Sequence, residues 1–160
     1  MKKGTFITIL LVTLSLSAFA QGTPRLSLVL DEEKVNMTAA ERSGRSDVAY
    51  LPGDTIRYML TASNVGDALM TNPEIVDPVP GGTTYVPESA VGANCTIVYS
   101  IDGGSSYSAW PVTYEVRNAR GERVTKTATP DMISHIKWNI QRDLAPGEAH
   151  ELEFRVEVTR

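Results

Sequence analysis

The clearest pattern in the chain is the alternation of apolar and polar residues near its C-terminal end. From 151 to 158 every second residue is apolar and every residue between is charged or polar, and the stretch 134–140 alternates in the same way. Successive side chains of a β-strand point to opposite faces, so such stretches have one face in a core and one in water. We therefore predict two strands here, joined by a tight connection at 144–148.

A third strong candidate follows the turn residues Pro52-Gly53-Asp54. Between 55 and 63 the residues Ile56, Tyr58, Leu60 and Ala62 fall on one face. Weaker β-rich pieces are separated by Gly, Pro, Asn and Asp, and two of them are the arms of a hairpin around 118–121. These pieces lie at 26–30, 75–76, 83–86, 96–101, 112–116 and 124–126.

Many short strands with little helical periodicity are typical of an antiparallel β-sandwich. We predict an all-β, immunoglobulin-like sandwich that forms a single domain over residues 21–160. The polar stretch 38–45 is compatible with one helical turn or with an exposed loop.

The first twenty residues predict export. A basic start at Lys2-Lys3 precedes an apolar run from Phe6 to Leu16, and Ala18-Phe19-Ala20 supplies a cleavage site. The run is shorter than the roughly 20 residues that span a bilayer. Residues 1–20 are therefore predicted to be a signal peptide, which places the mature chain in the periplasm, at the cell surface or outside the cell.

Charge narrows the choice of partners. The full chain carries 15 basic and 19 acidic residues, a net charge of −4, and removal of Lys2 and Lys3 leaves 13 against 19, or −6. An acidic surface repels phosphate backbones and anionic lipids, so nucleic acid is not an expected partner. The mature sequence has no second apolar stretch of membrane-spanning length, so we expect no membrane insertion.

Three motifs together resemble a known family. They run from Pro52 to Gly66, from Ile75 to Val86, and over Leu144-Ala145-Pro146-Gly147-Glu148. In this order and spacing they resemble the bacterial conserved repeat domain known as domain of unknown function eleven, here in a single copy. The resemblance implies an immunoglobulin-like fold in an exported or surface protein, and it implies no catalytic residues.

Few residues suggest chemistry. Cys95 is the only cysteine, so neither a disulfide nor a Cys-x-x-Cys pair can form within the chain. The two histidines, His135 and His150, are expected at the surface or rim. A triad of Ser134, His150 and Asp143 can be written for a small hydrolase, but no nucleophile-elbow motif accompanies it. We therefore predict no enzyme activity, no catalytic residues, no cofactor and no metal.

Two further patterns concern ligands. The stretch from Ser100 to Tyr107 resembles an Asp box, which is itself a device that stabilises a hairpin, and Tyr107, Trp110 and Tyr114 nearby are a candidate platform for stacking sugars. The acidic residues at 31–33 and Asp102 lack the spacing of a calcium loop.

The leading hypothesis from the sequence is an exported, non-enzymatic structural or interaction module that binds an envelope or surface protein. The expected contact regions are the hairpins at Gly103–Trp110 and Arg117–Glu122. A carbohydrate-binding module that uses Tyr107, Trp110 and Tyr114 is the first alternative, and a small hydrolase is the second.

Overall fold

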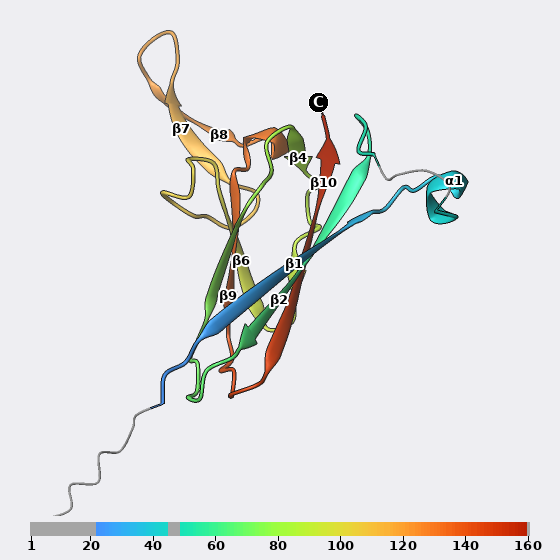
Figure 1. Cartoon of the computed structure of the whole chain (residues 1–160). Coiled ribbons are helices and arrows are strands. Elements are labelled where there is room, and N and C mark those ends of the chain that lie inside the picture. Colours follow the sequence, from blue (N-terminus) through green and yellow to red (C-terminus); the bar gives the residue numbers. More distant parts are fainter. Residues whose placement is uncertain (1–21, 45–48, 160) are drawn as a thin grey trace, which may run out of the picture.

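A computed structural model describes residues 22–44 and 49–159 as two antiparallel sheets packed face to face (Figure 1). The predicted all-β sandwich is therefore confirmed. The predicted signal peptide at 1–20 lies outside the described residues.

The larger sheet is built on two long strands that the alternation predicted. In order across the sheet it contains β1, β2, β10 and β4, and β5 also pairs with β10. Their bounds are Leu26–Lys34 for β1, Thr55–Asn64 for β2, Thr83–Tyr85 for β4, Val91–Gly92 for β5 and Ala149–Val158 for β10.

The smaller sheet has the order β3, β9, β6. Strand β9 lies in the middle and pairs through Trp138 with Ile75 on one side and Ile97 on the other. The bounds are Glu74–Pro78 for β3, Cys95–Ser100 for β6 and His135–Ile140 for β9, and the 3-10 turn η1 at Pro130–Met132 precedes β9.

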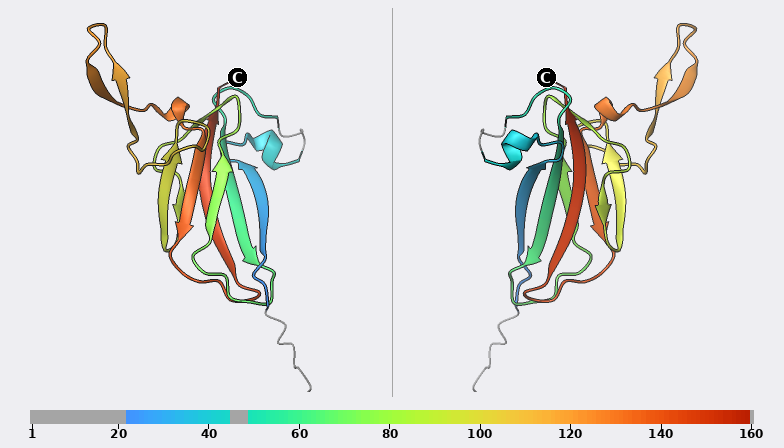
Figure 2. Two further views of the ribbon diagram at one scale, coloured as in Figure 1. Left: turned by 90° about the vertical axis from the view of Figure 1, so that its left-hand side faces the viewer. Right: turned by 90° about the vertical axis from the view of Figure 1, so that its right-hand side faces the viewer.

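The predicted hairpin forms a separate two-stranded sheet from β7 (Thr113–Arg117) and β8 (Arg123–Thr127). Figure 2 shows this hairpin projecting away from the sandwich at the end where the chain terminates.

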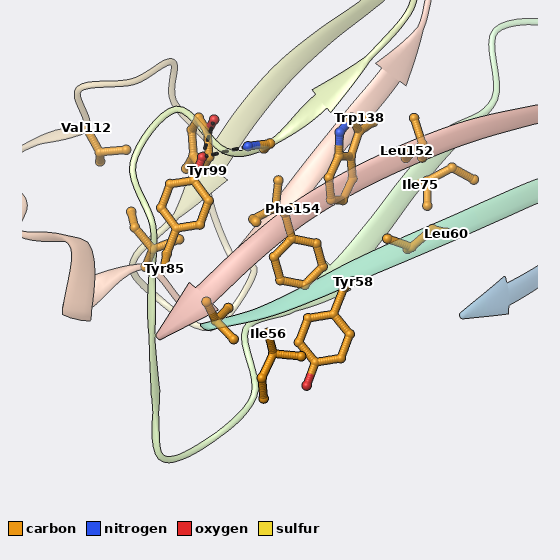
Figure 3. Close-up of a cluster of buried hydrophobic side chains, with 14 of the residues drawn as sticks. Ile56, Tyr58, Leu60, Ile75, Tyr85, Tyr99, Val112, Trp138, Leu152 and Phe154 are labelled. Carbon is orange, nitrogen blue, oxygen red and sulfur yellow. Dashed lines mark hydrogen bonds between the residues drawn. The ribbon is translucent and has the colours of Figure 1, made fainter. Parts of the chain in front are cut away.

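The core lies between the two sheets, where the alternating apolar residues meet (Figure 3). The rings of Phe154 and Tyr58 on neighbouring strands stack with centroids 5.1 Å apart, and Trp138 from the opposite sheet lies 6.0 Å from Phe154. The indole nitrogen of buried Trp138 donates to the carbonyl oxygen of Val91, at 3.2 Å. The polar tip of this large core residue is therefore satisfied without a water.

Residues 38–45, for which the sequence left two conformations open, contain one helical turn, α1 (Ala39–Arg42). Thr38 and Glu41 form a capping box: the Thr38 hydroxyl accepts from the Glu41 backbone N–H, and the Glu41 carboxylate accepts from the Thr38 N–H at 2.7 Å. Such reciprocal bonds stabilise the start of a helix.

Glu41 also reaches Lys34, a charged residue on the core-facing side of β1. The ammonium of Lys34 lies 2.8 Å from the carboxylates of both Glu41 and Asp54, and only 5% of the residue is exposed. The cation is therefore buried with two partners, and it ties β1 to α1 and to the turn before β2.

Candidate functional site

The three aromatic residues of the predicted sugar platform face different neighbours. Trp110 packs edge-on against Tyr99 and Tyr85, with centroids 5.8 and 6.1 Å away. Tyr107 instead lies under the ammonium of Lys137, 4.7 Å from the ring centroid. Tyr114 packs from β7 against the core. No two of these three rings stack on each other, and the Trp110 ring packs mainly against buried tyrosines.

The Asp-box segment forms a hairpin turn, as predicted. The Asp102 carboxylate accepts from the hydroxyl of Ser100 at 2.7 Å and from the hydroxyl and backbone N–H of Ser106 at 2.6 and 2.9 Å. These bonds, those from Ser106 first, lower the pKa of Asp102 to about 2. The turn ends in the antiparallel bridge between Tyr99 and Ser108. All oxygens of Asp102 are thus used within the turn, which makes this carboxylate a folding element.

Ser134 and His150 lie apart. Ser134 comes just before β9, and its hydroxyl donates to the carbonyl oxygen of Ser100 at 3.1 Å and accepts from the N–H of Gly103. His150 lies near the start of β10, at the end of the sandwich where β9 finishes. The histidine beside Ser134 is its neighbour His135, with Nδ1 3.2 Å from the hydroxyl oxygen. The postulated triad of Ser134, His150 and Asp143 is therefore not assembled.

The structure corrects the expected position of His150. The residue is 6% exposed, not at the surface, because it is in phase with Leu152 and Phe154 on the core-facing side of β10. His135 lies partly exposed on the face opposite Ile136, as expected.

His150 contacts Cys95, which the sequence had shown only as a lone cysteine at the start of a strand. Its Nε2 lies 3.5 Å from the Cys95 sulfur, and its Nδ1 accepts from Arg142 Nε at 3.4 Å. Because Nδ1 is the acceptor, the neutral ring carries its proton on Nε2 and points it at the sulfur. Burial raises the pKa of the Cys95 thiol. The contact therefore favours a protonated, structural cysteine.

The hairpin of β7 and β8 projects from the sandwich and is largely exposed. Most of its residues are exposed, and it joins the sandwich at a buried base, where the Ala128 N–H donates to the Val112 carbonyl oxygen at 2.8 Å. Residues 113–127 carry four basic and two acidic side chains, a net charge of +2 on an otherwise acidic protein. The basic residues are Arg117, Arg120, Arg123 and Lys126.

The tip of this hairpin is ordered by its own side chains. The Asn118 amide oxygen accepts from the backbone N–H groups of Arg120 and Glu122 at 2.9 and 3.0 Å, and Arg117 donates to the Gly121 carbonyl oxygen at 2.8 Å. Gly121 has a φ of 80°, a conformation that other residues rarely adopt. The loop thus holds Arg120 at the far end of a defined structure.

A groove of 570 Å³ lies on the outer face of the larger sheet, where β1, β2, β10 and β5 come together. Met59 and Val91 form part of its wall, and the carboxylates of Asp31, Glu151 and Glu153 make it acidic. This groove is open, and of the residues that the sequence analysis weighed as ligands it contains only Asp31.

Residues 22–44 and 49–159 contain no cluster of three or more His, Cys, Asp or Glu side chains arranged for a metal ion. Over the same residues, no helix is long and apolar enough to cross a membrane.

The fold and the sites define this chain as an all-β sandwich with one projecting basic hairpin. Comparison with protein-family models, with curated proteins and with solved structures gave no match. The resemblance to the bacterial conserved repeat domain therefore stays a prediction.

Proposed function

We propose that this chain is an exported, non-enzymatic interaction module of the bacterial cell envelope that binds an envelope partner through its β7–β8 hairpin. The observation that carries this proposal is the hairpin itself, which projects from the sandwich and concentrates basic side chains on an acidic protein.

Without a partner, this hairpin would contribute little to the stability of the protein. An isolated two-stranded hairpin is marginally stable in water because it has little apolar surface to bury. Here the strands β7 and β8 pair with each other and with no other described strand, yet Asn118 and Gly121 order the tip. A pre-ordered loop loses less conformational entropy on binding, which favours affinity.

Charge indicates the kind of partner. Arg117, Arg120 and Arg123 lie near the tip, and guanidinium groups pair well with carboxylates. Electrostatic complementarity raises association rates and suppresses wrong partners. The partner surface is therefore expected to be acidic. The basic, apolar and small-residue order of residues 1–20 supports export, and the lack of a nucleophile-elbow motif in the sequence supports a non-enzymatic role.

The test is cross-linking in native cells followed by mass spectrometry, with the mature chain and two matched double variants. Arg120→Glu with Arg123→Glu reverses two exposed charges near the hairpin tip and keeps the Arg117 and Asn118 bonds that order it. Arg42→Glu with Arg155→Glu reverses two exposed charges elsewhere. A partner that links to wild type and to the second variant but not to the first supports the proposal. Equal capture by all three chains, or no reproducible envelope partner, overturns it.

A further inference from the structure

Strand β1 is an edge of the larger sheet, and no strand among residues 22–44 and 49–159 lies beside half of its backbone groups. The Val65 N–H donates to the Arg25 carbonyl oxygen and the Val35 N–H to the Thr55 carbonyl oxygen, both at 2.8 Å. Backbone groups of an antiparallel strand alternate between its two sides, so the odd-numbered residues of β1 bond to β2. The N–H and C=O groups of the even-numbered residues, Leu26 to Lys34, therefore point outward.

The two halves of this edge differ in how far other side chains cover them. At the C-terminal half, Glu32 accepts a 2.9 Å hydrogen bond from the Tyr50 hydroxyl, and Lys34 is buried against Glu41 and Asp54. No described residue covers the N-terminal half in this way.

In that half, three leucines lie on the core-facing side of the sheet but outside the buried core. Leu26, Leu28 and Leu30 are 41%, 43% and 49% exposed. Proteins commonly protect an exposed edge with proline, a bulge or an inward-pointing charge. Between Leu26 and Leu30 the sequence has none of these.

We propose that this half-edge pairs with the same half-edge of a second copy of the chain, antiparallel and centred on Leu28. The N-terminal part of β1 is self-complementary about that residue. In this register Leu28 lies opposite its own counterpart, Leu26 lies opposite the second copy's Leu30, and Arg25 lies opposite the second copy's Asp31.

Hydrogen bonding and side-chain chemistry both select this register. The residues that come opposite each other, 26 with 30 and 28 with 28, are those whose backbone groups point outward, which allows about six new backbone hydrogen bonds. A register centred on Val29 would place Leu26 opposite the Glu32 carboxylate. Only the Leu28-centred register pairs every exposed leucine with a leucine and brings opposite charges together on the other face.

The edge is also held rigid before any pairing. The segment before β1 packs so closely on Gly66 that a Cβ added there would lie 2.2 Å from the Thr23 carbonyl oxygen. A preformed strand binds another strand with little ordering cost. This surface does not include the β7–β8 hairpin. The test of the dimer is therefore independent of the test of the hairpin partner.

The experiment is sedimentation equilibrium of mature Gln21–Arg160 up to about 100 µM, a range that detects weak dimers. Wild type should form dimers. Leu28→Lys should be monomeric because two like charges meet at the symmetry axis, whereas Leu51→Lys, at a more exposed leucine (60%) outside the edge, should still dimerise. A monomeric wild type, or a Leu28→Lys chain that dimerises as well as wild type, overturns the proposal.

A charge exchange tests the register and does not depend on Leu28. Arg25→Asp or Asp31→Arg alone should raise the dimer dissociation constant by about tenfold, since two ion pairs per dimer become repulsive. The double variant should return it to near the wild-type value. Single variants without effect, or a double variant weaker than both, would contradict pairing centred on Leu28.

Discussion

The side-chain amide nitrogen of Asn64 donates a 2.8 Å hydrogen bond to the carbonyl oxygen of Leu144, eighty residues further along the chain. The same nitrogen donates to the Ala68 carbonyl oxygen, and the amide oxygen accepts from the backbone N–H groups of Gly66 and Arg25. Asn64 is fully buried. One side chain thus joins the end of β2, the start of β1 and the connection between β9 and β10.

Replacement of the buried Asn64 should strongly destabilise the protein. Asn64→Ala removes the partner of the Arg25 and Gly66 N–H groups and of the Ala68 carbonyl oxygen, all partly buried, and we expect the free energy of unfolding to fall by about 3 kcal/mol. Asn139→Ala is the control, because Asn139 is partly exposed and makes only a 3.4 Å bond to the Thr96 carbonyl oxygen. Urea unfolding of both variants checks this, and equal losses would contradict it.

Gly66 should tolerate no side chain. A Cβ at this position would lie 2.2 Å from the Thr23 carbonyl oxygen and 2.5 Å from the Arg25 nitrogen, both backbone atoms that cannot rotate away. Gly66→Ala is expected to cost about 2 kcal/mol of unfolding free energy. Gly81→Ala is the matched control, since a Cβ there meets no atom within 4 Å. A Gly66→Ala chain as stable as the Gly81→Ala chain would show that the start of β1 is not packed on Gly66.

Long strands could be predicted from their alternation of apolar and polar residues. Short elements whose position is set by pairing with distant residues could not. Strands β2, β9 and β10 follow from their period of two. The two-residue β5 carries no such period, because its place is set by pairing with Leu152 and Glu153. The predicted hairpin at 118–121 formed because its turn residues act locally.

The same contrast applies to the candidate sites. Tyr107, Trp110 and Tyr114 are close in sequence but face different neighbours, since proximity along a chain that turns says little about direction. The buried position of His150 could have been predicted, because the residue is in phase with Leu152 in a strand that was predicted. Its contact with Cys95 was not predictable, because it joins residues fifty-five positions apart through the packing of two sheets.

The ion pairs of Lys34 with Glu41 and Asp54 (the Lys34 cluster) should contribute less to stability at both extremes of pH. The hydrogen bond with Lys34 lowers the pKa of Glu41 from 4.5 to about 2 and lowers the pKa of Asp54 below its ordinary 3.8. Their contribution is present above about pH 4.5 and is lost as the pH falls toward 2. The pKa of Lys34 is raised above 10.5, chiefly by Asp54, so its contribution is present below that pH and is lost as the pH rises through the folded-state value.

Thermal unfolding across pH checks this cluster. Lys34→Met leaves the carboxylates of Glu41 and Asp54 without their cation, so the melting temperature at neutral pH should fall by several degrees. The further loss between pH 4.5 and 2 should become shallower than in wild type, because the pKa of Glu41 is no longer held down. Lys126→Met, at an exposed lysine of β8, should keep the wild-type profile. An unchanged acid limb in Lys34→Met would contradict the assignment.

The Cys95 thiol should react slowly near neutral pH despite its contact with histidine. Burial raises the thiol pKa above 9.0, and His150 presents its Nε2 proton to the sulfur because Nδ1 accepts from Arg142. Since the thiolate is the nucleophile, the alkylation rate with iodoacetamide should rise steadily above pH 9 without an inflection near neutral. A Val91→Cys thiol in a Cys95→Ser chain, exposed on β5, should react faster at every pH. An inflection near neutral pH for Cys95 would contradict a protonated, structural cysteine and would indicate a thiolate–imidazolium pair instead.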